Sequence, residues 1–307
     1  GKPLRFINSE APLTILCLGE LLVDCLGQAQ IPGGAPANVA CHVAGLGGSA
    51  SLVSRVGHDP TGIVLADFLN SRGIGAGHLQ VDDLHRTGAV RVMPGPCYEI
   101  AGPAAWDFIE LTDGARAAAK GASVVVFGTL AQRQPVSRRT IRALVETARE
   151  ARVPALCDLN LRAPFFDEET ALWCLRNCDV LKLNRGELDI VSRMLHAQGN
   201  AENLFAGLLR EFGISCGVLT DGEHGAWFCQ DGNPRHHPAE KAADFCDAVG
   251  AGDACSAVLA LALSRGLPLH QAAAPAAGLA AFVTAQPGAT PRIPASLAAR
   301  LNALLGA

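Results

Sequence analysis

The sequence predicts an α/β protein with a central, mostly parallel β-sheet flanked by helices and a small β-sheet lid beside it. Three observations support this: short apolar runs alternate with longer helical patterns, several runs are apolar throughout, and one region breaks the alternation. Such alternation is typical of parallel sheets, whose strands are covered by helices on both faces. With 307 residues, 49% hydrophobic and 18% charged, the chain can bury a core of that size.

The predicted strands are short and apolar or β-branched. They lie at Thr14–Leu18, Ser51–Val56, Ser123–Phe127, Ala155–Asp158, Val180–Leu183 and Cys216–Thr220. Stretches with helical periodicity predict helices at Ala37–Gly45, Thr61–Arg72, Val136–Ala151, Glu168–Asn177, Arg185–Leu195, Asn200–Phe212, Asp253–Arg265, Leu269–Ala285 and Ala295–Leu305. Ser137 and Asp167, at the start of two of these helices, are of the residue types that cap helices.

The region 86–111 breaks the alternation of strands and helices. Thr87–Val92 and Tyr98–Ile100 alternate in polarity around the turn Pro94-Gly95-Pro96, which predicts a β-hairpin. Together with residues 21–32, this region is predicted to form the lid, and residues 1–20, 33–85 and 112–307 form the main domain. Because a hairpin alone is only marginally stable, the lid must pack on the main domain or on a second subunit.

Charge and composition exclude several classes of protein. A net charge of −4 and a pI near 6.1 leave no basic surface for nucleic acid or anionic membrane. No apolar run approaches the ~20 residues that cross a bilayer, so we expect a soluble protein. The eleven cysteines are odd in number and no secretory signal precedes them, so we expect free thiols and a cytoplasmic location. Cys174 and Cys178 lack a second pair at zinc-site spacing.

The strongest chemical signal is the run from Asp247 to Asp253, which reads Asp-Ala-Val-Gly-Ala-Gly-Asp and precedes a predicted helix. Gly250 and Gly252 let the backbone turn and let a ligand approach its amides. A helix that begins here directs unpaired N–H groups and its positive dipole end at the loop, which makes an anion hole suited to a phosphate. Asp253, at its edge, could accept a hydroxyl proton. The alternative is a glycine-rich loop with a helix-capping aspartate.

A second glycine turn, Gly33-Gly34-Ala35-Pro36-Ala37-Asn38, also precedes a helix. It lacks the Gly-Lys-Ser/Thr of a P-loop and the Gly-x-Gly-x-x-Gly of a dinucleotide fold. Its backbone amides and the donor and acceptor of Asn38 suit sugar hydroxyls. The alternative is a plain loop-to-helix turn.

Together, the two segments resemble the two signatures of the PfkB (ribokinase-like) carbohydrate kinase family, in the family's order and at about its spacing. The first signature covers residues 33–75 and the second covers Asp247–Ala257. Further landmarks match along the chain, at Gly19–Asp24, Asp158–Arg162, Lys182–Glu187 and Thr220–Gly225. The resemblance covers nearly the whole chain and implies a ribokinase-like three-layer sandwich.

The resemblance implies ATP-dependent phosphoryl transfer to a sugar hydroxyl, with Asp253 as general base. The amides of Gly250, Ala251 and Gly252 would form the anion hole. The implied sugar-binding residues are Asp24, Gly33, Gly34, Asn38 and Arg162, and the implied nucleotide-binding residues are Asn184, Thr220, Gly222 and Gly225.

The resemblance also implies two cation sites. Asn184 and Glu187 would organise Mg²⁺, mainly through water, with helix capping as the alternative for this pair. Asp247 and the loop Thr284–Thr290 resemble the monovalent-cation site of many members, which takes K⁺. Ala248 and Cys255 stand where the family usually has Thr and Phe, and these departures weaken the claim of cation dependence.

The choice of sugar stays open at this point. Asp158-x-Asn160-x-Arg162 and the segments 105–109 and 128–133 resemble the bacterial fructokinase-type branch, which favours fructose. Arg162 could instead hold the carboxylate of 2-keto-3-deoxygluconate. A nucleoside kinase ranks third, because aromatic residues make up only 5% of the chain. A non-catalytic sugar-binding relative and a vitamin-precursor kinase are further alternatives. The resemblance also implies a homodimer that pairs its lids.

Overall fold

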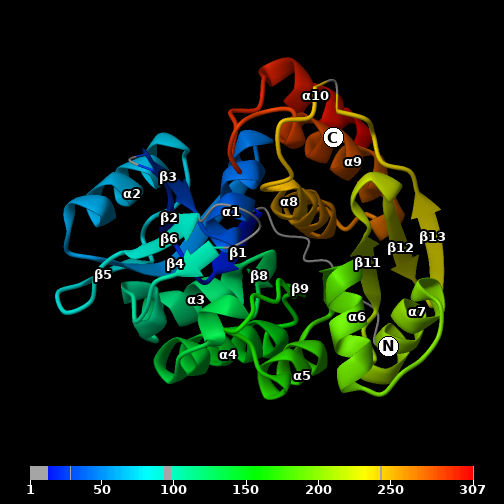
Figure 1. Ribbon diagram of the computed structural model, residues 1–307, viewed down its shortest axis with the longest axis horizontal. Coiled ribbons are helices and arrows are strands. Elements are labelled where there is room, and N and C mark those ends of the chain that lie inside the picture. Colours follow the sequence, from blue (N-terminus) through cyan, green and yellow to red (C-terminus); the bar gives the residue numbers. More distant parts are fainter. Residues whose placement is uncertain (1–12, 28, 93–97, 243, 307) are drawn as a thin grey trace.

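The computed structural model describes residues 13–27, 29–92, 98–242 and 244–306. Nine strands form the main sheet, in the order β13-β12-β11-β10-β9-β8-β1-β4-β5 (Figure 1). Their bounds are β1 (Thr14–Leu18), β4 (Ser49–Gly57), β5 (Leu79–Asp82), β8 (Val124–Phe127), β9 (Ala155–Asp158), β10 (Val180–Asn184), β11 (Cys216–Thr220), β12 (Ala226–Gln230) and β13 (Asn233–His237). All neighbours from β5 to β11 are parallel, and β12 and β13 add an antiparallel edge. The predicted mostly parallel sheet is confirmed.

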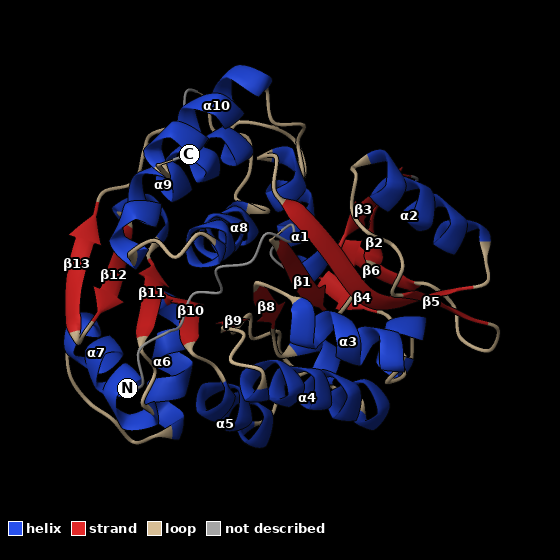
Figure 2. Ribbon diagram, turned by 180° about the vertical axis from the view of Figure 1, so that it is seen from behind, coloured by secondary structure: helices blue, strands red, loops and turns tan. Residues whose placement is uncertain are grey.

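Helices cover both faces of this sheet. They are α1 (Ala35–Gly45), α2 (Pro60–Ser71), α3 (Asp113–Gly121), α4 (Pro135–Glu150), α5 (Glu168–Asn177), α6 (Arg185–Met194), α7 (Ala201–Phe212), α8 (Ala251–Ser264), α9 (Ala273–Thr284) and α10 (Ala295–Leu304). Helices α1, α8, α9 and α10 lie on one side and α3 to α7 on the other (Figure 2). The buried apolar residues form two clusters, one on each face of the sheet. In β1, Ile15 and Cys17 belong to the cluster that includes α1 and α8, whereas Leu16 and Leu18 belong to the cluster on the other face. Burial on both faces explains why this strand is apolar throughout.

A separate four-stranded sheet, in the order β3-β2-β6-β7, lies beside the main domain. Its strands are β2 (Leu22–Leu26), β3 (Ala29–Gly33), β6 (Gly88–Val92) and β7 (Tyr98–Ile100). Strands β6 and β7 form the predicted antiparallel hairpin, and β2 joins the two segments by pairing in parallel with β6. The predicted turn Pro94-Gly95-Pro96 lies outside the described residues. The predicted small sheet is confirmed.

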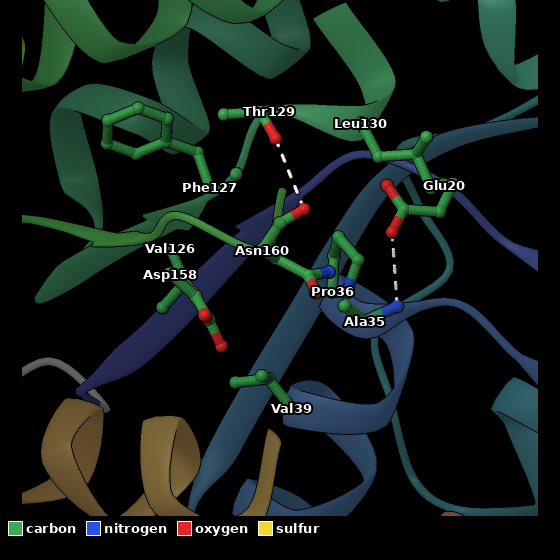
Figure 3. A pocket seen from close by; sticks show the side chains of 11 residues that line it. Glu20, Ala35, Pro36, Val39, Val126, Phe127, Thr129, Leu130, Asp158 and Asn160 are labelled. Carbon is green, nitrogen blue, oxygen red and sulfur yellow. Dashed lines mark hydrogen bonds between the residues drawn. The ribbon is translucent and has the colours of Figure 1, made fainter. Parts of the chain in front are cut away.

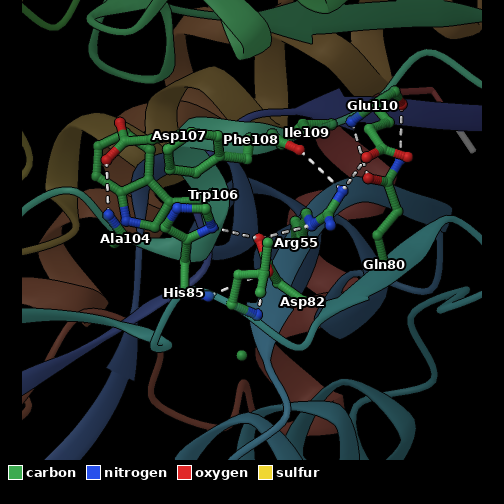
Figure 4. Close-up of polar contacts among 12 residues, drawn as sticks. Arg55, Gln80, Asp82, His85, Ala104, Trp106, Asp107, Phe108, Ile109 and Glu110 are labelled. Atoms are coloured by element: carbon green, nitrogen blue, oxygen red, sulfur yellow. Dashed lines mark hydrogen bonds and ion pairs between the residues drawn. The ribbon is translucent and has the colours of Figure 1, made fainter.

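The chain returns from β7 to the main domain through a short 3₁₀ helix, η1 (Ala105–Phe108). The side chains of Trp106 and Asp107 in this helix are fully buried. Arg55 of β4 donates a hydrogen bond of 3.0 Å to the Phe108 carbonyl and forms an ion pair of 3.0 Å with Asp82 (Figure 4). The last part of region 86–111 therefore packs into the main core.

The structure corrects and extends the prediction at a few places. Asp167 caps α5 as expected, because its Oδ1 accepts from the Thr170 amide at 2.7 Å. Ser137 is not a cap: it lies inside α4, and its hydroxyl donates to the Trp106 carbonyl at 2.8 Å. Helix α3 and the edge strands β5, β12 and β13 were not predicted.

Two findings concern the composition arguments. No helix in the described ranges combines the length and apolarity needed to span a bilayer. The cysteines in the described part of the chain are free thiols, and most of them are buried.

Candidate active site

The candidate site lies at the carboxyl edge of the parallel strands. Strand order reverses between β1 and β8, because the chain continues from β1 to β4 on one side and from β8 to β9 on the other. Ligands of open α/β sheets bind at such a switch point. A cavity of about 20 Å³ opens there, lined in part by Glu20, Thr129, Asp158 and Asn160 (Figure 3). This cavity is large enough for one water-sized group.

Asp253 lies in the first turn of α8, which begins after Gly250 in the left-handed conformation (φ 83°). Its Oδ2 accepts a hydrogen bond of 2.8 Å from Asn38 Nδ2 of α1. Burial, and then the nearby charge of Asp158, raises the pKa of Asp253 to about 6, against the opposing effect of Asn38. The structure thus brings together the two predicted motifs, although 215 positions separate the bonded residues.

The backbone amides at the start of α8 are open to a ligand. The helix has no side-chain N-cap, and the Ala251 amide makes only a 3.5 Å contact with the Ala248 carbonyl. In the part of the chain that the structure describes, the amides of Gly252 and Asp253 have no acceptor. Unpaired amides and the positive end of the helix dipole make this end of α8 suited to an anion.

A buried ion pair lies beneath this loop. Lys182 Nζ of β10 lies 3.0 and 2.9 Å from the two carboxylate oxygens of Asp158 of β9. Ser256 of α8 donates to Asp158 Oδ2 at 2.7 Å. A Cβ at Gly252 would lie 2.8 Å from Lys182 Nζ, so this glycine allows the ammonium group to approach the loop. The sequence reasoning gave Lys182 no role, although a lysine inside the apolar run of β10 was a detectable signal.

The predicted sugar-binding residues lie near one another. A Cβ at Gly33 would lie 2.6 Å from Asp24 Oδ2, which places this carboxylate against the glycine turn. Gly34 has a positive φ of 107°, and a Cβ at this position would meet the Glu20 carbonyl, so the turn requires glycine here. The charge of Arg162 lowers the pKa of Asp24, whereas burial has the larger effect and raises it. Arg162 acts in the same direction on Asp253, so it lies within electrostatic reach of both carboxylates.

Glu20 is a site residue that the sequence reasoning missed. Its side chain is buried, and Oε1 accepts from the Ala35 amide at 3.2 Å (Figure 3). Burial raises the pKa of Glu20 to about 7, and the charge of Asp253 adds to this rise. A carboxylate two residues after the end of the buried strand β1 was the signal that could have identified it.

The residues predicted for nucleotide and Mg²⁺ lie at the ends of β10 and β11. Asn184 and Thr220 pair in register, and Gly222 and Gly225 follow in a turn with positive φ at both. Asn184 and Glu187 form a capping box of α6: Asn184 Oδ1 accepts from the Glu187 amide at 2.9 Å, and Glu187 Oε2 accepts from the Asn184 amide at 2.8 Å. Asn184 and Glu187 therefore cap the start of α6, which was the alternative to the Mg²⁺ prediction.

The hydrogen bonds that Asn184 and Glu187 already make limit how this pair could hold Mg²⁺. Glu187 Oε1 also accepts from the Leu161 amide at 2.9 Å, so each carboxylate oxygen already has a partner. No cluster of three or more His, Cys, Asp or Glu side chains among the described residues could hold a metal. The pair fits an ion that keeps its water shell and meets the protein through water, as Mg²⁺ commonly does.

Asp247, predicted for a monovalent cation, lies next to the start of loop 284–290. Its amide, at 3.3 Å, and the Cys246 amide, at 2.8 Å, both donate to the Thr284 carbonyl. Its Oδ1 accepts from the Val249 amide at 2.8 Å, so this oxygen acts as a turn cap. Asp247 and the start of loop 284–290 therefore lie close together, as the prediction of a cation site requires.

Comparison with known proteins shows the family of this chain. Residues 13–296 match the family described as pfkB family carbohydrate kinase. The chain is 30% identical to fructokinase from Escherichia coli over 262 residues, which cover 80% of this chain and 83% of that enzyme. It is also 30% identical to fructokinase from Klebsiella pneumoniae over 307 residues, covering 91% of this chain and 96% of that enzyme.

Solved structures show the same fold. A double mutant of fructokinase from Vibrio cholerae O395, in its fructose-, ADP- and potassium-bound form, is 27% identical with a TM-score of 0.82, covering 97% of this chain and 100% of that chain. Fructokinase from Xylella fastidiosa with bound ATP is 22% identical with a TM-score of 0.83, covering 97% of this chain and 100% of that chain. The chain belongs to the pfkB family and is a carbohydrate kinase.

Proposed function

We propose that this carbohydrate kinase transfers the γ-phosphoryl group of ATP to a hydroxyl of fructose, with Asp253 as the general base. One observation carries the proposal: Asp253, held by Asn38, stands at the rim of the uncapped start of α8. A base and an anion hole are thereby adjacent, as in-line transfer to a hydroxyl requires.

The catalytic step follows from the charges at this position. With a pKa of about 6, Asp253 is mostly ionised at pH 7 yet basic enough to take a proton from a bound hydroxyl. The hydroxyl oxygen forms its bond to the γ-phosphorus as the bond to the β-phosphate oxygen breaks. The amides of Gly250, Ala251 and Gly252 would bind the negative charge that gathers on the phosphoryl oxygens. Asn38 keeps the carboxylate oriented.

The remaining proposed roles surround this centre. Asp24, Gly33, Gly34 and Arg162 would bind the sugar, and Thr220, Gly222 and Gly225 would lie along the nucleotide. Mg²⁺, when bound, neutralises phosphate charge, and Asn184 and Glu187 would hold its water shell. Asp247 and loop 284–290 would take K⁺, a proposal supported by the potassium ion in the Vibrio cholerae enzyme.

Fructose is the favoured sugar because fructokinases are among the relatives at 30% identity. The charge of Arg162 near Asp24 favours 2-keto-3-deoxygluconate as a second candidate, because a guanidinium binds a planar carboxylate well. The ADP-release experiment below would also reveal a nucleoside kinase or a non-catalytic sugar-binding protein.

We also propose that the lid, residues 21–32 and 86–111, pairs with a second copy in a cytoplasmic homodimer. Strand β3 is an edge of the small sheet, and Ala29 and Gln30 on it are exposed. Unpaired strand edges favour pairing with another chain. Mass measurement in solution tests this: we expect twice 31.8 kDa at micromolar concentration, and a monomer would contradict it.

ADP release with fructose, 2-keto-3-deoxygluconate, ribose and adenosine tests the function. We expect the highest kcat/KM with fructose. In Asp253→Asn, kcat should fall by about 10³-fold, because the amide keeps the hydrogen bond to Asn38 but cannot take a proton. The matched control is Asp113→Asn, which changes an exposed first-turn aspartate of α3. Sugar binding without ADP release would show a non-catalytic relative, and unchanged turnover in Asp253→Asn would exclude this base.

A further inference from the structure

A buried ion pair lies under the catalytic centre and has no role in the mechanism above. Lys182 and Asp158 are both about 5% exposed, and Lys182 Nζ contacts both Asp158 oxygens at 2.9–3.0 Å. Ser256, one turn after Asp253 on α8, also donates a hydrogen bond to Asp158, at 2.7 Å. Three elements, β9, β10 and α8, therefore share one charged cluster in the core. A buried ion pair has a large desolvation cost, so stability alone is a weak explanation for it.

The cluster contacts the loop that forms the anion hole. The position of a Cβ at Gly252 is only 2.8 Å from Lys182 Nζ, so the ammonium group packs directly against the loop backbone. The ammonium group has three N–H donors, and its contacts with the two Asp158 oxygens use two of them. One donor is left over. The Lys182 ammonium is held by the Asp158 carboxylate and lies against Gly252, so its positive charge sits beneath the loop.

The groups that act on the titration of Asp253 come from several elements around it. Asp158 of β9 raises the pKa of Asp253, whereas Asn38 of α1, Lys182 of β10 and Arg162 after β9 lower it. Glu20, after β1, is electrostatically coupled to Asp253 as well. The two members of the ion pair thus act on Asp253 in opposite directions, because one carries negative charge and the other positive.

We propose that Lys182 and Asp158 are positioning residues of the catalytic centre: the Lys182 ammonium holds positive charge under the anion hole, and the pair together balances the charge of Asp253. The proposal rests on the proposed function of Asp253 as base. Neither side chain need touch the sugar or ATP. Their effect passes through the loop backbone and through the field at the Asp253 carboxylate.

Removing the cation and removing the anion should shift the titration midpoint of Asp253 in opposite directions. Lys182→Met removes the cation, so the Asp253 carboxylate becomes harder to ionise and its titration midpoint should rise by about one pH unit or more. Asp158→Asn removes the anion, so the midpoint should fall below about 6. Opposite shifts would show that both charges act on the Asp253 carboxylate, and the kinetic readout below asks whether that action serves catalysis.

The experiment titrates Asp253 directly, by ¹³C NMR of protein labelled at the aspartate carboxyl carbons, with Asp253→Asn identifying the signal. Ser256→Ala is the matched control, because it removes a hydrogen bond to Asp158 but no charge. If Lys182→Met does not fold, Asp158→Asn still carries the test, and adding Lys182→Met to it should reverse its downward shift. Opposite shifts support the proposal; equal-sign shifts or none overturn it.

A kinetic readout separates this inference from the proposed function. In Lys182→Met we expect kcat for the best sugar to fall about 10²-fold with little change in KM, because the charge acts on the transition state. The acid limb of kcat/KM should move with the NMR midpoint. Absence of sugar turnover in the unmodified protein would refute the kinase function and, with it, the catalytic part of this inference. Full turnover with unshifted midpoints would refute the inference alone.

Discussion

The two glycine turns at the centre of the molecule begin in the same way and end differently. Helices α1 and α8 each follow a glycine with positive φ, Gly34 at 107° and Gly250 at 83°, and neither has a side-chain N-cap. The two helices pack against each other. At α1, however, Glu20 accepts from the Ala35 amide, whereas the first amides of α8 have no side-chain partner in the described residues.

This difference shows how one local motif serves two purposes. At the start of α1 the Ala35 amide already donates to the Glu20 side chain, so this amide is not free for an outside anion. The start of α8 meets no carboxylate cap, and a buried cation lies beneath it. Only the second turn is therefore suited to a phosphate, while the first suits neutral hydroxyls.

Alanine substitutions at the two turns should separate folding from chemistry, and we expect the largest effect on stability here. A Cβ at Gly34 would meet the rigid Glu20 carbonyl, so Gly34→Ala should lower the free energy of unfolding by about 3 kcal/mol. A Cβ at Gly252 would meet only the end of the Lys182 side chain, so Gly252→Ala should fold while kcat falls. Urea denaturation and ADP release measure both. Equal loss of stability in the two variants would contradict this contrast.

The carboxylate at α1 should make stability depend on pH. The pKa of Glu20 rises from 4.5 to about 7 on folding, so the native state binds the extra proton and loses stability as pH rises through that window. Glu20→Gln lacks this loss and keeps an acceptor for the Ala35 amide. Relative to the unmodified protein, its free energy of unfolding should therefore gain about 3 kcal/mol between pH 4.5 and pH 8. Urea melts across this range measure it; a flat difference, like that expected for the exposed control Glu150→Gln, would contradict it.

The smallest expected effect concerns inorganic phosphate. At concentrations about tenfold above its dissociation constant, phosphate should stabilise the protein by about 1 kcal/mol through the open start of α8. Thermal melts in phosphate and in chloride of matched ionic strength measure this. Gly252→Ala should lose the gain, because its Cβ displaces Lys182, whereas Glu20→Gln should keep it. A larger gain in Glu20→Gln, together with an unchanged gain in Gly252→Ala, would place the anion at α1 and reverse the comparison.

Much of the fold could be predicted from the sequence, because helices cover both faces of most of its parallel strands. Strands β1, β9 and β11 have the predicted bounds, since each is an apolar run that ends at a polar residue or turn. The hairpin of β12 and β13 was missed because residues such as Asn233, Arg235 and His236 give it no apolar alternation. Helix α3 was missed because it is only nine residues long and its buried residues are the alanines Ala115 and Ala119, which give no run of large apolar side chains.

The predicted site is less complete than the predicted fold. Asp253 and Asn38 were identified from motifs, and the structure joins them by a hydrogen bond. Glu20 and Lys182 were overlooked, because the role of a charged residue beside or inside an apolar strand can be inferred only when its partner is known. For Lys182 that partner is Asp158, 24 positions away, and Ser256 reaches the same carboxylate across 98 positions.

The sequence by itself determined the α/β class, the family resemblance and the two glycine turns, because these depend on local periodicity and on residues close together in the chain. Only the tertiary structure decided which turn stays open to an anion. That choice depends on where Glu20 and Lys182 are brought by β1 and β10, and electrostatic fields depend on distance in space, not on distance along the chain. The same packing gives Asp253 its burial and its neighbours, and with them its raised pKa.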